Sequence, residues 1–254
     1  MRGVEDRPVA YVYKYRRGEQ AELKLKIKNI CQTKVRYGYR RVHVLIRRDG
    51  WVVNPKRIYP LYKEMGLQLR NKTPARRVKA KLRTDRRETT HSNHVWAMAL
   101  VHDQLATGRK IRVLTVVDTF SRFSPTVDAS INYKGEDVVQ TLERVCRQVG
   151  YPATIRVDNG SEFISQDLDL RVYYKGVFLD FSRSGKPTDN SDIEGFNGKL
   201  RAQCLNAHWF MSLDDARAKM EDWRRDYNEF RPHRAIGNNV PISLMNGSSA
   251  STPN

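Results

Sequence analysis

The sequence predicts an α/β protein in which a mixed sheet flanked by helices follows a small all-α domain. Apolar residues recur at helical spacing in the first third, whereas strand-length apolar runs separated by short turns begin near residue 94. The charges divide the chain at the same place. Residues 1–92 hold 26 Lys and Arg against 8 Asp and Glu, and residues 93–254 hold 20 of each, so the formal net charge of +18 lies entirely in the first third.

This charge asymmetry indicates a module that binds a polyanion, because Lys and Arg displace counterions from phosphates. A solubilising or ribosome-like basic arm is the alternative. The three cysteines are far apart and show no zinc-finger spacing, which favours a reduced, cytosolic protein. No run approaches the roughly 18 apolar residues that span a bilayer, and the first 17 residues lack the apolar segment of a signal peptide.

Residues 18–69 are expected to form a helix-turn-helix domain. Asn54 provides an N-cap and Pro55 a first-turn proline for the last of its helices. In this arrangement Lys56 and Arg57 lie at the front of the recognition helix. The three predicted helices cover residues 18–31, 38–48 and 55–66.

Pro60 falls in the middle of the third predicted helix. There it removes a hydrogen bond and clashes with the preceding turn, at a cost of about 3 kcal/mol, so we expect either a kink or a damaged domain. Residues 1–17 are predicted to form a flexible basic arm. Residues 70–92 are basic and aperiodic, and they are predicted to form a linker that also lies along DNA.

Residues 93–235 are predicted to form a second, larger domain. Its elements follow the order β-β-β-α-β-α-β-α-α, in which a meander feeds a mixed sheet, and this is the order of a ribonuclease-H-like fold. Residues 236–254 are expected to be a C-terminal tail. The strands are predicted at 94–101, 110–118, 123–129, 153–157 and 177–181, and the helices with assigned ranges at 135–149, 189–206 and 212–230.

Two acidic residues of this domain are candidates for chemistry. Asp158, in IRVDNGSEF, lies where an apolar strand ends, which is where sites of open α/β sheets gather. Glu194, in TDNSDIEGFNGKL, lies at the margin of the apolar stripe of a helix, and 35 residues separate it from Asp158. Alone, Asp158 could be a turn-forming Asp-Asn-Gly and Glu194 a solvated helix residue, but the pairing at this spacing favours a site.

These motifs closely resemble the DDE transposases of bacterial insertion sequences, which are kin to retroviral integrases. The resemblance covers nearly the whole chain and points to the downstream-frame product of that group. The gap between Asp158 and Glu194 and the basic Arg201, seven residues after the glutamate, are specific to it. The other matching segments are DNG at 158–160, DN at 189–190, EGFNGKLR at 194–201, YNEFRPH at 227–233 and the N-terminal RYGYRRVHVLIRRDG.

The resemblance implies a transposase that cuts element-end DNA and joins it to a target. Three carboxylates would hold two Mg²⁺ ions, with Mn²⁺ as a substitute, for an in-line displacement by water or a 3′-hydroxyl. It further implies double-stranded DNA as partner, a homo-oligomer on paired ends, an upstream-frame segment outside this chain, and a bacterial cytoplasmic, nucleoid-associated location. The expected DNA contacts are Arg40, Arg41, Lys56, Arg57, Arg76, Arg77, Lys199 and Arg201.

The first of the three carboxylates is missing. Members of the family carry an aspartate in the first core strand, in a context like W-x-M-D-F, whereas Ala99 stands at that position here. Asp103 lies about 13 Å along the same strand. Asp118 falls about 10 Å away and on the opposite face if residue 115 pairs with residue 99. Neither is a credible replacement.

Two hypotheses therefore stay open: an active transposase, and a catalytically inactive DNA-binding copy of one. A generic basic nucleic-acid-binding protein is the third reading, and it does not explain the spacing of the carboxylates. Asn190 precedes Glu194 by one helical turn, where capping explains it nearly as well as a site role. Asp192 stands where the family usually has an apolar residue, and we expect it to face solvent.

Overall fold

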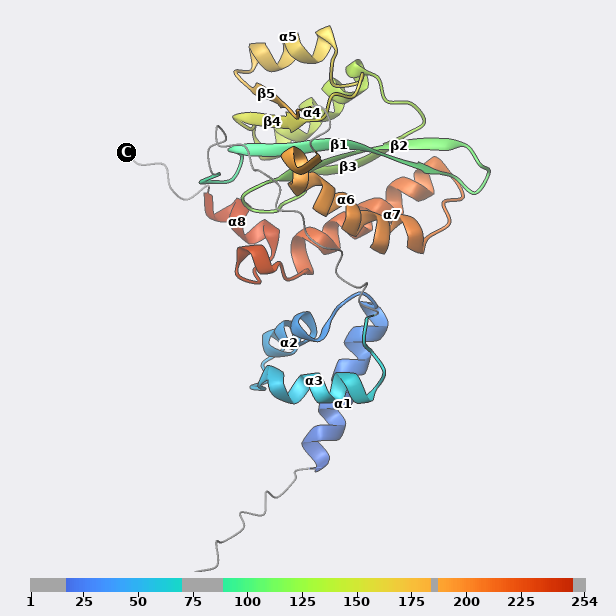
Figure 1. The fold of residues 1–254 in the computed structure, drawn as a ribbon, viewed down its shortest axis with the longest axis vertical. Coiled ribbons are helices and arrows are strands. Elements are labelled where there is room, and N and C mark those ends of the chain that lie inside the picture. The colour runs from blue at the N-terminus through green and yellow to red at the C-terminus, as the bar shows by residue number, and fades with distance from the viewer. Residues whose placement is uncertain (1–16, 70–88, 184–186, 249–254) are drawn as a thin grey trace, which may run out of the picture. The chain divides into compact units, whose positions relative to one another are not determined.

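The computed structural model describes residues 17–69, 89–183 and 187–248 (Figure 1). The chain divides into two compact units, residues 1–74 and residues 75–254. The predicted arm at 1–17 and most of the predicted linker at 70–92 lie outside the described residues.

The first unit contains the three predicted helices: α1 (Arg17–Thr33), α2 (Tyr39–Arg48) and α3 (Pro55–Glu64). Each helix contributes one apolar stripe to a common core, so none of the three could bury its apolar face alone. The core residues are Leu23, Ile27 and Cys31 of α1, Val42 and Ile46 of α2, and Ile58, Leu61 and Tyr62 of α3.

The start of α3 is fixed by the predicted cap. The Asn54 side-chain oxygen accepts a hydrogen bond from the Lys56 backbone N–H at 2.8 Å, which satisfies one of the free donors of the first turn. Pro60 lies inside α3 with its side chain exposed, and the helix continues to Glu64. An interruption of the helix at Pro60 is therefore excluded, although the missing N–H still weakens the helix.

The second unit is built on the predicted mixed sheet, with strand order β3-β2-β1-β4-β5. The first three strands form the antiparallel meander, β4 pairs with β1 in parallel, and β5 pairs with β4 in parallel. The parallel strands require crossover connections, which the helices between them supply. The strands are β1 (Val95–Gln104), β2 (Lys110–Asp118), β3 (Thr126–Ser130), β4 (Thr154–Val157) and β5 (Phe178–Phe181).

Helices cover both faces of this sheet (Figure 1). Helices α4 (Gly135–Val149) and α5 (Gln166–Tyr174) cover one face, and α6 (Ser191–Gln203) and α7 (Leu213–Arg225) cover the other. The two faces of β1 alternate accordingly, since Trp96 and Met98 pack toward α4 and α5, whereas Ala97 and Ala99 pack toward α6. The predicted element order is confirmed.

Several predicted boundaries were wrong. Strand β3 starts at Thr126 rather than at 123, because Arg122, with a φ of +64°, and Pro125 occupy the turn before it. The helix predicted at 189–206 starts as a 3₁₀ turn and ends at Gln203, and the one predicted at 212–230 changes to a π-turn at Asp226. Residues 236–254, expected as a tail, contain helix α8 (Pro241–Ser248). Among the described residues, no helix is both long and apolar enough to cross a membrane.

Candidate active site

Position 99 and Asp158 lie side by side on neighbouring parallel strands. The last residue pair of the β1–β4 register joins Ala97 to Arg156, so two residues further along come Ala99 and Asp158, on strands about 4.8 Å apart. Both face the same side of the sheet. Because Val157 packs with Met98 on the α4 side, their neighbours Asp158 and Ala99 face α6.

Helix α6, which carries Glu194, packs on the same face of β1 as Ala99. Its residues Ile193 and Phe196 are buried against the same cluster that contains Ala99, so α6 lies across β1 on the Ala99 face. The Asn190 side-chain amide donates a hydrogen bond to the Met98 carbonyl at 3.3 Å, which fixes the start of α6 to the residue before Ala99. Glu194 follows about 6 Å further along the helix axis and is exposed, as is Asp158.

The sequence left two interpretations of Asn190 open, a cap of the helix and a role in the site. It occupies the N-cap position of α6, but in the described structure its side chain makes no capping hydrogen bond. The amide reaches β1 instead, and its oxygen is buried without a partner among the described residues. Of the two interpretations left open, capping by the side chain is contradicted, and the contact with Met98 was not predicted from the sequence.

Asp158 also forms the turn that its motif predicts. Its Oδ1 accepts a hydrogen bond from the Gly160 N–H at 3.1 Å. The next residue, Asn159, donates from its side chain to the Ser182 carbonyl at 3.0 Å, which ties the turn to the end of β5. The turn interpretation and the site interpretation are therefore compatible, because the turn holds the carboxylate at the strand end.

Neither of the two nearby aspartates considered from the sequence, Asp103 and Asp118, replaces the missing carboxylate at position 99. Ala99 pairs with Thr115, as expected from the position of the hairpin turn. Asp118 is buried, and its two oxygens accept hydrogen bonds from Asn93, Phe120 and Ser121. Burial raises the pKa of the Cys204 thiol to about 12, with a smaller contribution from the charge of Asp103. Asp103 therefore lies near Cys204, which is just past the far end of α6.

The donor set therefore does not fit a two-metal centre. Within the described part of the chain, no group of three or more His, Cys, Asp or Glu could hold a metal ion. The site provides two carboxylates, Asp158 and Glu194, where a bridging pair of ions needs more. The third position holds the methyl group of Ala99, which is 8% exposed and packed among apolar side chains.

Comparisons with known proteins identify both domains. Models of the integrase core domain match residues 89–187 and 175–241, and a model of an HTH-like domain matches residues 18–74. The chain is 41% identical to the insertion element IS407 31.7 kDa protein of Burkholderia multivorans, over 88% of this chain and 80% of that protein. It is 25% identical to the transposase of insertion element IS2D of Escherichia coli, over 91% of this chain and 80% of the relative.

The chain belongs to the insertion-element transposase family. A further relative is the insertion element IS476 39.2 kDa protein of Xanthomonas euvesicatoria, which is 40% identical over 87% of this chain. The chain covers 64% of that relative, which is less than two thirds of its length. Among solved structures, a simian T-cell lymphotropic virus intasome aligns with a TM-score of 0.56 at 15% identity, over 87% of this chain and 74% of that one. The predicted ribonuclease-H-like, integrase-like fold is thus confirmed.

Two ion pairs hold the start of α6 in this transposase-family core. Asp189 is buried and accepts two hydrogen bonds from the Arg183 guanidinium, each at 2.8 Å. Asp192 pairs with Arg122 of the β2–β3 connection. The expectation that Asp192 faces solvent was wrong, because Arg122 lies 70 residues earlier in the chain and only the folded sheet brings it to α6.

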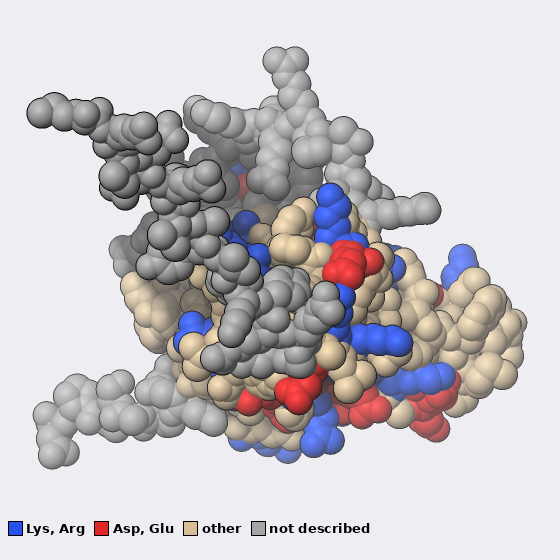
Figure 2. Space-filling view, turned by 90° about the horizontal axis from the view of Figure 1, so that it is seen from below, with Lys and Arg blue, Asp and Glu red and all other residues tan. Residues whose placement is uncertain are grey.

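The predicted DNA contacts lie in both units. Arg40, Lys56 and Arg57 are exposed on α2 and α3, and Arg41 is half-buried with its guanidinium 5.5 Å from the centre of the Tyr37 ring. On α6, Lys199 is half-buried and Arg201 exposed, while Arg76 and Arg77 lie outside the described residues. Figure 2 shows exposed Lys and Arg side chains on one face of the molecule, with acidic side chains beside several of them. Their roles stay predictions.

Proposed function

We propose that this chain binds double-stranded DNA at the ends of an insertion element, and that its core is organised for cutting and joining DNA strands. The proposal is supported by the register of β1 and β4, from which we infer that Ala99 and Asp158 occupy neighbouring positions, and by the Asn190–Met98 hydrogen bond, which holds the start of α6, the helix of Glu194, against β1. The HTH-like unit supports the DNA-binding part, since residues 17–69 hold 13 Lys and Arg against 4 Asp and Glu.

Strand cutting and joining on this fold is an in-line displacement at phosphorus, by water or by a 3′-hydroxyl. A complete set of three carboxylates would hold Mg²⁺ or Mn²⁺ ions, which would stabilise the attacking and leaving oxygens. This chain supplies Asp158 and Glu194, so the set would be complete only with an acidic residue at position 99. A homo-oligomer that pairs two DNA ends is part of the proposal, supported by the intasome among the structures of similar fold.

Ala99 favours a second candidate function. With a methyl group at the first acidic position, the chain would occupy element ends without catalysing transfer. One experiment distinguishes the two candidate functions. It compares strand transfer by this chain with strand transfer by its Ala99→Asp variant in Mg²⁺ or Mn²⁺. We expect transfer after the substitution and none before it. Transfer by the unmodified chain at a comparable rate would overturn the assignment of the site.

The DNA-binding part is tested by deleting residues 1–92. We expect the deletion to remove most of the salt-sensitive affinity for duplex DNA, because each phosphate contact adds about 0.9 to the slope of log affinity against log salt concentration. Fluorescence anisotropy over a salt titration measures this slope for the full chain and for residues 93–254. Equal slopes for the two proteins would contradict the assignment of DNA binding to the first unit.

A further inference from the structure

The outward face of α3 carries an apolar pair between two cations. Four residues at helical spacing, Lys56, Tyr59, Pro60 and Lys63, are exposed, and the opposite face is buried in the core of the unit. Tyr59 is 46% exposed. The face of α3 that is free to contact a partner is therefore apolar in the middle and positive at both ends.

Tyr59 is held in place by its neighbours on α2. Its ring lies 4.9 Å from the Tyr39 ring, centroid to centroid, at an interplanar angle of 57°. The Arg40 Nε in turn donates to the Tyr39 hydroxyl at 3.2 Å. The exposed face of α3 is thus continuous with the cationic start of α2. An aromatic ring fixed in this way loses little conformational freedom when it contacts a partner.

Pro60 has no structural function within the unit that would explain its presence. It cannot donate the helical hydrogen bond to the Lys56 carbonyl, and its exposed ring contributes nothing to the core. Almost any other residue at this position would give a more stable helix. What Pro60 does provide is a rigid apolar surface on the outward face, beside Tyr59.

We propose that Tyr59 and Pro60 select thymine in the major groove of element-end DNA. This inference rests on the proposed DNA-binding function and specifies which base α3 recognises. The groove, about 12 Å wide, admits an α-helix, and the only apolar group among its base edges is the thymine C5-methyl. Lys56 and Lys63 lie about 10 Å apart along the helix axis, so they flank the apolar pair and reach the phosphates on either side.

The test uses the full chain and a duplex selected by it from a pool of random double-stranded DNA. Each thymine of the selected duplex is replaced in turn by deoxyuridine, which removes the methyl group alone. We expect replacement of a contacted thymine to weaken binding about fourfold, the value of one buried methyl group. In Pro60→Ser and Tyr59→Ser, binding should no longer depend on that methyl group.

The Pro60→Ser variant distinguishes a loss of thymine recognition from a loss of stability, because the substitution is expected to raise the melting temperature while it removes the dependence of binding on thymine. Lys63→Ala is the matched control. It should weaken binding to all duplexes alike and reduce the salt slope by about one, with the thymine dependence intact. Two results would overturn the inference. The first is sequence-selective binding that deoxyuridine does not weaken, and the second is binding that still depends on the thymine methyl group in both serine variants. Failure of the full chain to bind duplex DNA at all overturns the proposed function itself.

Discussion

At the scale of the residue, one side chain separates this chain from a complete carboxylate site. Asp158 is held at the end of β4 by its own turn, and Glu194 is placed by the first turn of α6. Ala99 lies two residues beyond the last β1–β4 pair, as Asp158 does, and its methyl group is in the apolar cluster that α6 covers. The surroundings of position 99 are thus in place, and what is missing is a carboxyl group.

Asn190 is predicted to fix the position of Glu194. The Asn190→Ala substitution leaves the Met98 carbonyl without its side-chain donor, which should destabilise the protein by about 1 kcal/mol. Hydrogen exchange should rise in residues 191–195 more than elsewhere, because the anchor of this turn is lost. Urea unfolding and exchange measured by mass spectrometry test both effects. The control is Asn159→Ala, a substitution of an exposed residue, which should leave hydrogen exchange in α6 unchanged. If α6 exchanges equally fast in Asn190→Ala and in the parent, the contact of Asn190 with Met98 does not hold the start of α6.

Glu162, in the loop after Asp158, gives a pH prediction. Burial raises its pKa, but its backbone hydrogen bond and the Arg112 guanidinium outweigh this, so the net pKa lies below the ordinary 4.5. A carboxyl with a lowered pKa stabilises the folded state above its unfolded pKa, and this contribution disappears as the pH falls through the folded pKa. Glu162→Gln should therefore be less stable than the parent at pH 7, and the difference should shrink below pH 4.5. A difference that stays constant from pH 7 to pH 3 would contradict the assignment.

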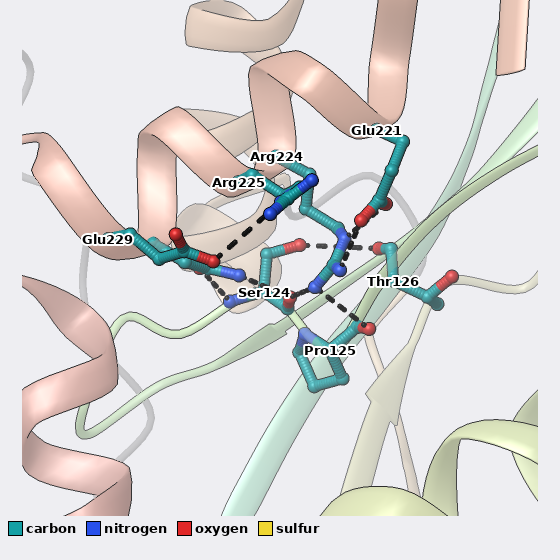
Figure 3. A network of polar contacts seen from close by, with 8 residues as sticks. Ser124, Pro125, Thr126, Glu221, Arg224, Arg225 and Glu229 are labelled. Carbon is teal, nitrogen blue, oxygen red and sulfur yellow. Dashed lines mark hydrogen bonds and ion pairs between the residues drawn. The ribbon is translucent and has the colours of Figure 1, made fainter. Parts of the chain in front are cut away.

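At the scale of the element, α7 covers the edge of the sheet at β3. An edge strand presents backbone groups that can pair with another chain. Here Arg217 donates to the Ala129 carbonyl at 2.9 Å, and Arg224 donates to the Ser124 and Pro125 carbonyls at 2.9 and 3.4 Å (Figure 3). Pro125 itself lacks an N–H. The two arginines, two helical turns apart, therefore occupy acceptors at both ends of the edge strand.

Arg224 and its neighbour Arg225 form a matched pair for testing this arrangement. Arg224→Ala should destabilise the protein by about 1–3 kcal/mol, because it removes the donor to the Pro125 carbonyl, one of two donors to the Ser124 carbonyl, and the partner of Glu221. Arg225 has an exposed side chain 3.9 Å from Glu229, so Arg225→Ala should change stability by less than about 0.5 kcal/mol. Urea denaturation of both variants gives the comparison. Equal effects would show that the contacts with β3 contribute little.

The elements that were predicted best from the sequence are those with a clear period. Ile193, Phe196 and Leu200 recur at helical spacing, so α6 and the margin position of Glu194 could be predicted. Helix α5 buries Leu168 and Val172 as its only fully buried residues, and this weak pattern explains why its range was not assigned. The contact of Asn190 with Met98 joins residues 92 positions apart. Such contacts depend on how α6 packs on the sheet, which the local pattern does not encode.

At the scale of the whole molecule, the charge division in the sequence corresponds to a division of structure. The first compact unit carries a large positive excess, and the second has a balanced charge from residue 93 onward. The first is suited to hold DNA through its phosphates, and the second holds the carboxylates in an integrase-like sheet. The central proposal is that position 99, Asp158 and Glu194 form one site, in which Ala99 is predicted to prevent catalysis.

The most direct test is a strand-transfer assay of Ala99→Asp on duplexes that carry the ends of the encoding element, in Mg²⁺ or Mn²⁺. We predict that the unmodified chain is inactive and that Ala99→Asp joins ends to target DNA. Adding Asp158→Asn or Glu194→Gln to Ala99→Asp should abolish this activity, whereas adding Asp103→Asn should not. Transfer by the unmodified chain, or an inactive Ala99→Asp variant that is folded and bound to DNA, would contradict the claim.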